Sequence, residues 1–426
     1  MFKSLRLINV GPAPTMKLDF GSRLNVLTGD NGLGKSFLLD IAWWAMTRKW
    51  PAEINPKLTA GKAARPSGPA AASIRFSFEG KTRSEDYESS YSRRAQAWTG
   101  RPGRPANPGL VVYAMSDGSF AIWDPSRNYW RNQDGEDIQE RRPAYVFDPA
   151  EVWDGLPGDN GTWLCNGLIR DWAGWQKENG PPFAHLKRLL RRMSPSGGEA
   201  LAPGELTRIS LDDVRDMPTI RMSYRQDVAV VHASAGMRRI MALAYCLVWA
   251  WEEHKHAAGQ LGDEPAGQIT FLIDEIESHL HPAWQRSVVP ALFSAMQALN
   301  PEAEVQLLAA THSPLIMASI EPRFDADTDA WFDLDFEEGG VVLRRRDFEK
   351  RGDAATWLIS EAFDLPSGRP LEYERLVEEA QVLLNREEPD IDEIERMNGD
   401  LLRALSPKDY FLLNWRYICR KKGWLT

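Results

Sequence analysis

Apolar and polar residues alternate at the start of the chain. Residues 3–10 (Lys-Ser-Leu-Arg-Leu-Ile-Asn-Val) follow this alternation, which predicts a strand with one buried face. A glycine and two prolines interrupt it before residues 16–20 alternate again, so the pattern predicts a hairpin. Residues 24–28 are the next predicted strand, which leads into a glycine-rich turn and an apolar stretch at 37–46. We therefore expect a strand, a loop and a helix in direct succession.

The later segments are of three kinds. Alternating runs predict a small antiparallel sheet, and they lie at 73–78, 110–115 and 120–123. Residues 162–193 look helical, and residues 240–251 are apolar almost all round, which is typical of a buried helix. Short apolar runs bounded by polar segments, at 269–273 and 305–309, predict core strands of a parallel sheet.

The composition excludes several protein classes. The 426 residues are 43% hydrophobic and 26% charged, as in ordinary globular proteins. The apolar stretch 240–251 is shorter than the roughly 20 residues of a membrane helix. The three cysteines form no close pair, which excludes a disulfide framework and a CxxC metal site. We expect a cytoplasmic protein of two or three domains with no membrane partner.

The net charge of −9 is unevenly distributed. Residues 321–426 hold 25 acidic and 16 basic residues, so the preceding 320 residues are neutral overall. Within that neutral part, residues 57–104 hold ten basic and four acidic residues. The charge therefore does not exclude DNA. The basic insert and the acidic tail are either interaction surfaces or solvated faces.

One motif carries the strongest chemical signal. It reads Gly29-Asp30-Asn31-Gly32-Leu33-Gly34-Lys35-Ser36, with Phe37 starting the expected helix. Its glycines allow backbone N–H groups to converge on phosphate oxygens. Lys35 then reaches the β- and γ-phosphates, and the Ser36 hydroxyl ligates Mg²⁺. The strand before the motif and the helix after it are the context that such a loop requires.

Two acids follow the apolar run 269–273. We expect Asp274 to hold the metal and Glu275 to orient and deprotonate the attacking water. The alternative is a strand that ends in a solvated acidic turn. The upstream phosphate loop favours the catalytic interpretation.

Two further elements indicate the class of nucleotide hydrolase. His312 follows the run 305–309 and would lie beside the γ-phosphate, although a structural histidine is the alternative. Ser234 and Gly236 precede the buried helix, where free N–H groups favour an anion; an ordinary Ser N-cap is equally good locally. The order of the four elements along the chain favours the functional interpretation.

This order resembles that of the ATP-binding-cassette (ABC) ATPases, in particular the soluble branch with the SMC and RecF heads. The resemblance implies an α/β fold: a P-loop NTPase core with an antiparallel β lobe, a helical insert and an α-helical C-terminal region. It makes Gly29–Ser36 the Walker A motif, Asp274–Glu275 Walker B, and His312 the switch histidine. Ser234 and Gly236 become the signature, which in this family contacts ATP bound to a second subunit. ATP, Mg²⁺ and a homodimer or higher homo-oligomer are thereby implied.

The chain departs from that family in three places. The signature lacks its second adjacent glycine, and residues 37–233 show no heptads, which excludes a long coiled-coil arm. The Q-loop glutamine has no clear position: Asp148 lies at a plausible strand end without a glutamine, and Gln139 and Gln176 are weaker candidates. Residues 277–282 follow Walker B, where ABC ATPases have the D-loop. Their two histidines, His279 and His281, either cross the dimer interface or cap the next helix.

Residues 280–285 and 312–314 resemble the compact, AAA-labelled ABC-type ATPases of bacterial anti-phage systems such as Septu, PARIS and retrons. This resemblance implies a partner effector, a nuclease or toxin encoded nearby. The OLD-family nucleases add a Toprim domain to such a head. Asp333-Leu334-Asp335 has its acid spacing but no upstream Glu-Gly, so we interpret it as a solvated acidic strand end.

We divide the chain into four parts on this basis. They are the N-terminal part of the head with Walker A (1–56), the inserted β lobe and helical segment (57–210), the C-terminal part of the head (211–320), and the acidic, mostly helical C-terminal region (321–426). In the last part, residues 370–385 and 401–417 are predicted helices.

The predicted function is that of an ATP-binding and hydrolysing ABC-type ATPase, which dimerises around ATP and gates an effector in anti-phage defence. Two alternatives stay open. One is a RecF-like repair ATPase that binds DNA through the basic insert. The other is a nucleotide-gated scaffold with little turnover.

Overall fold

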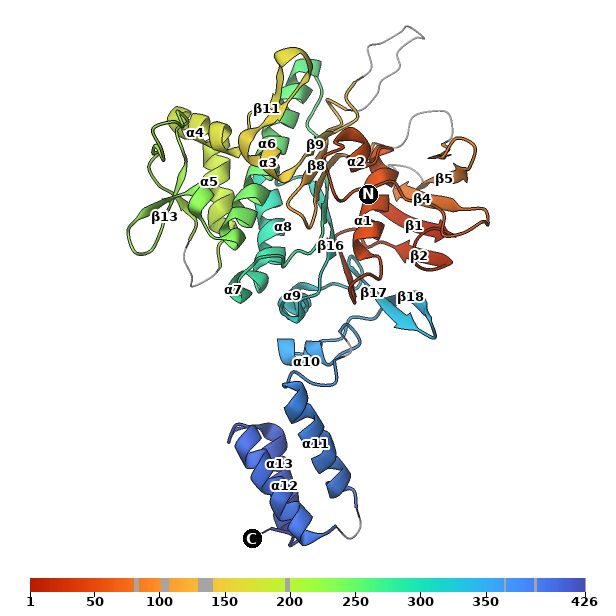
Figure 1. Cartoon of the computed structure of the whole chain (residues 1–426). Coiled ribbons are helices and arrows are strands. Elements are labelled where there is room, and N and C mark those ends of the chain that lie inside the picture. The colour runs from red at the N-terminus through yellow and green to blue at the C-terminus, as the bar shows by residue number, and fades with distance from the viewer. Residues whose placement is uncertain are drawn as a thin grey trace. The chain divides into compact units, whose positions relative to one another are not determined.

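The computed structural model describes residues 1–79, 84–100, 107–128, 141–195, 200–363, 365–386 and 389–425. The chain forms two compact units, Met1–Trp357 and Leu358–Thr426. It passes from one to the other within α10 (Ala354–Leu358) (Figure 1). Each unit has its own apolar core.

The first unit is built around an eight-stranded sheet in the order β18-β17-β3-β16-β15-β7-β8-β9. Neighbouring strands from β17 to β7 run parallel, while β18, β8 and β9 pair antiparallel at the edges. The bounds are β3 (Leu24–Gly29), β7 (Leu110–Ala114), β8 (Phe120–Trp123), β9 (Tyr145–Phe147), β15 (Gln268–Ile273), β16 (Glu304–Ala310), β17 (Ala330–Glu337) and β18 (Gly340–Arg346). The predicted parallel strands at 269–273 and 305–309 are thus confirmed.

Helices cover both faces of this sheet (Figure 1). α1 packs on one face with Trp43 beside Tyr113 of β7, and α6 packs on the other with Trp249 against Phe147 of β9. The predicted buried helix at 240–251 is the middle of α6. The helices of this core are α1 (Lys35–Thr47), α2 (Pro51–Ile54), α6 (Ala235–Leu261), α7 (Pro282–Gln285), α8 (Val288–Leu299) and α9 (Pro314–Ile320), with 3₁₀ turns η2 (Val230–His232) and η3 (Glu321–Arg323).

A second sheet packs its apolar face against α1. It has the order β2-β1-β4-β5-β6 and is antiparallel throughout, with bounds β1 (Phe2–Ile8), β2 (Thr15–Asp19), β4 (Ser73–Glu79), β5 (Ser84–Ser92) and β6 (Ala97–Trp98). The hairpin predicted at the N-terminus is confirmed. The prediction that 110–115 and 120–123 share a small sheet with 73–78 is wrong, because these two runs are β7 and β8 of the main sheet.

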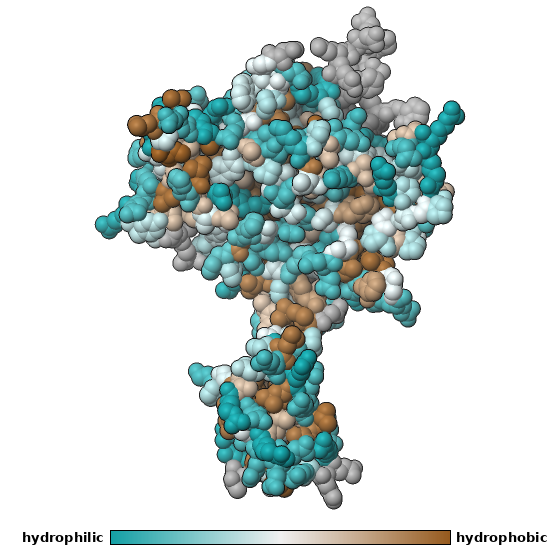
Figure 2. Space-filling view, in the orientation of Figure 1, coloured by the Kyte–Doolittle hydropathy of each residue, from teal (hydrophilic) through white to brown (hydrophobic). Residues whose placement is uncertain are grey.

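A helical insert separates the two sequence halves of the core. Residues 162–193, predicted as helical, contain β11, α4 and α5. The elements are α3 (Pro149–Asp154), β10 (Leu156–Pro157), η1 (Asp159–Gly161), β11 (Trp163–Cys165), α4 (Leu168–Glu178), α5 (Pro181–Met193), β12 (Ala202–Pro203), β13 (Thr219–Arg221) and β14 (Asp227–Ala229). Hydrophobic residues gather on the visible surface near α4 and β13 (Figure 2).

The interpretation of Asp333 as a solvated strand end is wrong. Asp333 lies in β17 directly beside β3, where it is fully buried and accepts a hydrogen bond from the Thr28 hydroxyl (2.7 Å). Burial raises the pKa of this carboxyl to about 6, even though Thr28 and Arg346 lower it. Residues 330–346, which the sequence analysis placed in the C-terminal region, belong to the main sheet.

The second unit is a bundle of three helices, α11 (Leu371–Leu384), α12 (Ile391–Ala404) and α13 (Tyr410–Lys421). They share a core that includes Leu383, Leu401 and Trp415. The helix predicted at 370–385 is confirmed, whereas the one predicted at 401–417 is two helices separated near Pro407. In the described part of the chain, every helix lacks the combination of length and apolar character that crossing a bilayer requires.

Candidate active site

The carboxyl ends of parallel strands bring the predicted site residues to one edge of the main sheet. Gly29 ends β3, Asp274 follows β15 and His312 follows β16. Ser116 comes two residues after the end of β7, the next strand along. Because these strands point the same way, the segments after them meet at one edge, where α/β proteins bind their ligands.

The loop between β3 and α1 has the shape of a phosphate cradle. Gly29 has a φ of +123°, and a Cβ there would lie 2.2 Å from the Leu334 carbonyl oxygen, so only glycine fits. Gly34 is the N-cap of α1, with a φ of 105°, and none of the described side chains caps this helix end. Residues 30–32 are exposed. The first N–H groups of α1 are therefore available to phosphate oxygens.

Lys35 lies buried beneath this loop. Its Nζ donates to the carbonyl oxygens of Gly29 (2.7 Å) and Asp30 (2.8 Å). Burial lowers the pKa of the amine to about 8, although nearby carboxylates, Asp274 first among them, raise it. The two carbonyl acceptors are weak substitutes for an anion, and phosphate oxygens at this position would replace them.

Asp274 is the candidate carboxylate for a metal site. It is 2% exposed and accepts hydrogen bonds from the hydroxyls of Ser36 and Ser116. Burial raises the pKa of this carboxyl despite those bonds. A buried carboxylate flanked by hydroxyl oxygens fits Mg²⁺, which takes oxygen ligands from one or two side chains and completes its shell with phosphates and water.

Glu275 directly follows Asp274 and has a left-handed backbone, with a φ of 45°. This conformation costs an L-residue ~1–2 kcal/mol, and such strain concentrates at functional sites. The neighbouring Ile276 N–H donates to the Ala310 carbonyl of β16 (3.2 Å), which anchors the turn. The half-buried Glu275 side chain therefore leaves the chain at a defined position next to Asp274.

His312 is half-buried and its ring is hydrogen-bonded to the Gly29 carbonyl. Burial, and then the charge of Lys35, lowers the pKa of this imidazole, so it is neutral at pH 7. Its backbone N–H donates to Oε1 of Glu277 (2.6 Å). The structure therefore brings His312, Lys35 and the phosphate-binding loop together, as the sequence predicts.

Ser234 and Gly236 lie at the start of α6. Ser234 is exposed and is the N-cap, with its Oγ accepting from the Met237 N–H (3.3 Å). A Cβ at Gly236 would lie 2.6 Å from the His279 carbonyl oxygen, so α6 begins directly against the segment after Walker B. Farther along this helix, the buried Arg239 donates to the Met115 carbonyl (2.8 Å).

Among the glutamines considered from the sequence, the one that the structure describes, Gln176, does not lie at this edge. Gln139 lies outside the described residues, and Gln176 donates to the Gly204 carbonyl (2.8 Å) in the insert. Asp148 caps α3. The position beside Asp274, at the end of β7, is taken by Ser116 instead. The sequence signal for the position of Ser116 is the uninterrupted apolar run 110–115 before it, which is typical of a central parallel strand.

The two histidines in the D-loop place differ. Nδ1 of His281 accepts from the Ala283 N–H (3.2 Å), so this residue caps α7, one of the two alternatives left by the sequence. His279 is exposed and has a φ of 62°.

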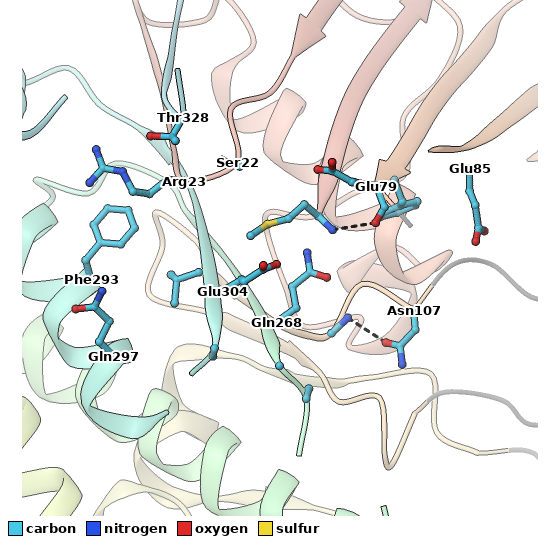
Figure 3. A pocket seen from close by; sticks show the side chains of 17 residues that line it. Ser22, Arg23, Glu79, Glu85, Asn107, Gln268, Phe293, Gln297, Glu304 and Thr328 are labelled. Carbon is cyan, nitrogen blue, oxygen red and sulfur yellow. Dashed lines mark hydrogen bonds between the residues drawn. The ribbon is translucent and has the colours of Figure 1, made fainter. Parts of the chain in front are cut away.

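The opposite edge of the sheet contains a cavity of about 1050 Å³, shown in Figure 3. Glu79, Glu85 and Glu304 line it, and the guanidinium of Arg23 in its wall is paired with Asp329 (Nε to Oδ1, 2.9 Å). Three carboxylates around a space repel a triphosphate. This cavity therefore has the volume of a ligand site without the chemistry of a nucleotide site.

Two sequence comparisons agree with this site. A family described as "AAA domain, putative AbiEii toxin, Type IV TA system" matches residues 24–318. The "Retron Ec83 probable ATPase" of Escherichia coli is 24% identical over 159 residues, which are 37% of this chain. The aligned part spans 26% of that relative's length.

The solved structures that match this chain include SMC head domains and the recombination mediator RecF. An SMC head domain from Thermotoga maritima has 14% identity and a TM-score of 0.39, over 82% of this chain and 99% of its own. An SMC head bound to the C-winged-helix domain of ScpA has 13% identity and a TM-score of 0.42, over 82% and 98%. The recombination mediator RecF has 12% identity and a TM-score of 0.34, over 80% and 98%.

The family match covers more than half of the chain and includes Walker A, the signature, Walker B and the switch histidine. The topology places these motifs as an ABC-ATPase head requires, with an antiparallel lobe packed against the P-loop helix. The chain thus belongs to this AAA-domain family and is a P-loop ATPase of the ABC type.

Proposed function

We propose that the protein binds ATP with Mg²⁺ at the carboxyl edge of its parallel sheet and hydrolyses it between two copies of the chain. The main support is the convergence of Lys35, Ser36, Asp274, Glu275 and His312 at the ends of three adjacent strands. Positioning and electrostatic stabilisation account for nearly all catalysis of phosphoryl transfer, and these residues supply both.

In the nucleotide complex, the segment Gly29–Phe37 wraps the phosphates with its N–H groups. Lys35 exchanges its two carbonyl acceptors for oxygens of the β- and γ-phosphates. Ser36 and Asp274 would hold Mg²⁺, which when bound neutralises charge on the phosphates. Release of the Gly29 carbonyl by Lys35 also frees the loop to adjust to the nucleotide.

For hydrolysis, Glu275 orients a water molecule and accepts its proton as the oxygen attacks the γ-phosphorus. In the nucleotide complex, the single ring N–H of neutral His312 leaves the Gly29 carbonyl and donates to the γ-phosphate. Because the pKa of His312 is lowered, the ring acts as a neutral donor and not as a cation.

The second copy contributes Ser234 and Gly236 in this proposal. The N-terminus of the 27-residue helix α6 favours an anion, and Ser234 is exposed there. The γ-phosphate of the facing copy would accept from this helix start, which completes each site in the dimer or a higher homo-oligomer.

We also propose that the ATP state controls a partner effector, a nuclease or toxin encoded nearby, in anti-phage defence. The support is the name of the retron relative and its 24% identity to this chain over 159 residues. The three-helix second unit lies outside the family match and is the proposed place of docking.

DNA binding through residues 57–104 receives less support. Lys57 is paired with Glu151 (2.7 Å), Arg75 with Glu88 (2.9 Å), and Arg93 donates to backbone carbonyls. Much of the described basic charge is therefore neutralised or occupied within the chain. Other basic residues of the insert lie outside the described residues: Lys81, Arg83, Arg101 and Arg104.

The test is steady-state phosphate release from Mg²⁺-ATP by the wild type and by Lys35→Ala. We expect turnover in the wild type that the variant loses. If the two proteins release phosphate at the same rate while the wild type still binds ATP, the enzyme interpretation is wrong and the nucleotide-gated scaffold takes its place.

A further inference from the structure

A carboxylate outside the predicted site joins two of its segments. Glu277 lies two residues after Glu275, and each oxygen of its carboxylate accepts one short hydrogen bond. Oε2 accepts from the Thr311 hydroxyl (2.6 Å), and Oε1 accepts from the His312 backbone N–H (2.6 Å). The segment after β15 is thus tied to the segment after β16, 34 and 35 residues farther along the chain.

These two bonds belong to a larger set that fixes the backbone on both sides of His312. The Thr311 N–H donates to the Leu27 carbonyl of β3 (3.0 Å), and the Thr311 hydroxyl accepts from the Ser313 N–H (3.0 Å). The Ser313 hydroxyl donates to Oε1 of Gln285 (2.7 Å). Residues 311–313 are therefore held by β3, by Glu277 and by the end of α7.

The chemistry of Glu277 suits orientation of its neighbours and not proton transfer. Both of its oxygens already accept a protein donor, and burial raises the pKa of the carboxyl above its ordinary value. Charge-assisted hydrogen bonds of this length are about twice as strong as neutral ones. Lys35 and Glu275 are both close enough to interact electrostatically with this carboxylate, so it lies within the site.

We propose that Glu277 is a positioning residue, which fixes the His312 backbone so that the imidazole reaches the γ-phosphate. This rests on the proposed function, in which His312 senses that phosphate. Without the carboxylate, the His312 N–H and the Thr311 hydroxyl lose their acceptor and the histidine is free to move. A misplacement of ~1 Å in such a group costs about 100-fold in rate.

The test compares Glu277→Ala, Glu277→Gln, His312→Ala and the Glu277→Ala/His312→Ala double variant in the full chain. We expect Glu277→Ala to lower kcat ~10- to 100-fold. The double variant should match His312→Ala alone, because Glu277 acts through that histidine. Glu277→Gln should retain most activity, since its amide oxygen accepts from the His312 N–H and its NH₂ group donates to the Thr311 oxygen.

A binding measurement separates this proposal from the proposed function. Dissociation constants for ADP and for a non-hydrolysable ATP analogue give the preference for a γ-phosphate, and Glu277→Ala and His312→Ala should reduce that preference equally. Thr311→Val removes the hydroxyl donor to Glu277 and the acceptor of the Ser313 N–H but keeps the bond from the His312 N–H to Glu277, so it should have a smaller effect. Thermal unfolding of each variant controls for folding.

Three results would overturn the positioning role while leaving ATP hydrolysis by the wild type intact. One is a Glu277→Ala variant with kcat within twofold of the wild type. Another is a double variant in which the two losses multiply. The third is a Glu277→Gln variant as inactive as Glu275→Gln, which would make Glu277 itself the base. A wild type that binds neither nucleotide would instead refute the proposed function.

Discussion

The two edges of the main sheet are formed by the two ends of the same strands, yet they carry different side chains. At the carboxyl edge, β3, β15 and β16 lead into Gly29, Asp274 and His312. At the amino edge, the cavity of about 1050 Å³ is walled by Glu304 at the start of β16 and by two further glutamates (Figure 3). The strands are common to both edges, so the difference lies in the residues at the strand ends and in the elements that surround each edge.

This comparison shows that volume alone does not identify the site. The carboxyl edge has a helix start that no described side chain caps, a lysine held on carbonyl oxygens, and a buried carboxylate with two hydroxyl donors. Each of these groups gains from a phosphate or a cation. The amino edge instead presents like charges, and its arginine is already paired.

The largest expected effect comes from Glu275→Gln. Loss of the base should lower phosphate release ~10²- to 10⁴-fold while ATP still binds. Because the dimer would no longer be dismantled by hydrolysis, light scattering with ATP should show a stable dimer. A variant that turns over normally would remove Glu275 from the mechanism.

Lys35→Ala should weaken ATP binding ~10- to 100-fold, since a charge-assisted hydrogen bond to phosphate is lost. Fluorescence titration with a labelled ATP analogue measures this directly. Arg23→Ala, at the opposite edge, is the matched cation control and should bind as the wild type does. An equal loss of ATP affinity in Lys35→Ala and Arg23→Ala would contradict the assignment of the nucleotide site to the carboxyl edge.

The affinity for ATP should fall as pH rises. The pKa of Lys35 is lowered to about 8 in the free protein, so the amine is charged below that pH and neutral above it. Between pH 7 and 9 the dissociation constant should rise ~10-fold. Lys35→Arg, whose charge persists over this range, should give a flatter profile. A flat profile in the wild type would contradict the lowered pKa.

The smallest expected effect is that of Ser116→Ala. Loss of a single hydroxyl donor to Asp274 should raise the Mg²⁺ concentration for half-maximal activity ~3- to 10-fold. Mn²⁺ titration of the ATP complex by electron paramagnetic resonance gives a readout independent of turnover. The exposed Ser210→Ala serves as the control, and identical metal affinities in the two variants would take Ser116 out of the site.

Local patterns were enough to predict the central part of this site. The phosphate loop is a contiguous strand, turn and helix, and Asp274 and Glu275 directly follow an apolar run. The phosphate loop, Asp274 and Glu275 can be recognised from the residues directly before and after them in the sequence. The same holds for His281, whose capping contact lies two residues away.

The features that the sequence analysis missed depend on pairing between distant strands. Ser116 reaches Asp274 because β7 pairs parallel with β15, more than 150 residues later in the chain. The sequence pattern of 110–115 predicts a strand of the antiparallel sheet, so it does not predict that Ser116 lies beside Asp274. Asp333 is buried because β17 pairs with β3, and Glu277 acquires its partners from the segment after β16. The alternation of apolar and polar residues within one segment does not specify which distant strand that segment pairs with.

The most direct test of the account is a matched pair of carboxylate-to-amide variants at the two edges, Glu275→Gln and Glu304→Gln. Single-turnover phosphate release from Mg²⁺-ATP would be measured for both variants and for the wild type. We expect Glu275→Gln to abolish the fast phase, whereas Glu304→Gln should match the wild type within about twofold. Normal release by Glu275→Gln, or loss of release in Glu304→Gln, would contradict it.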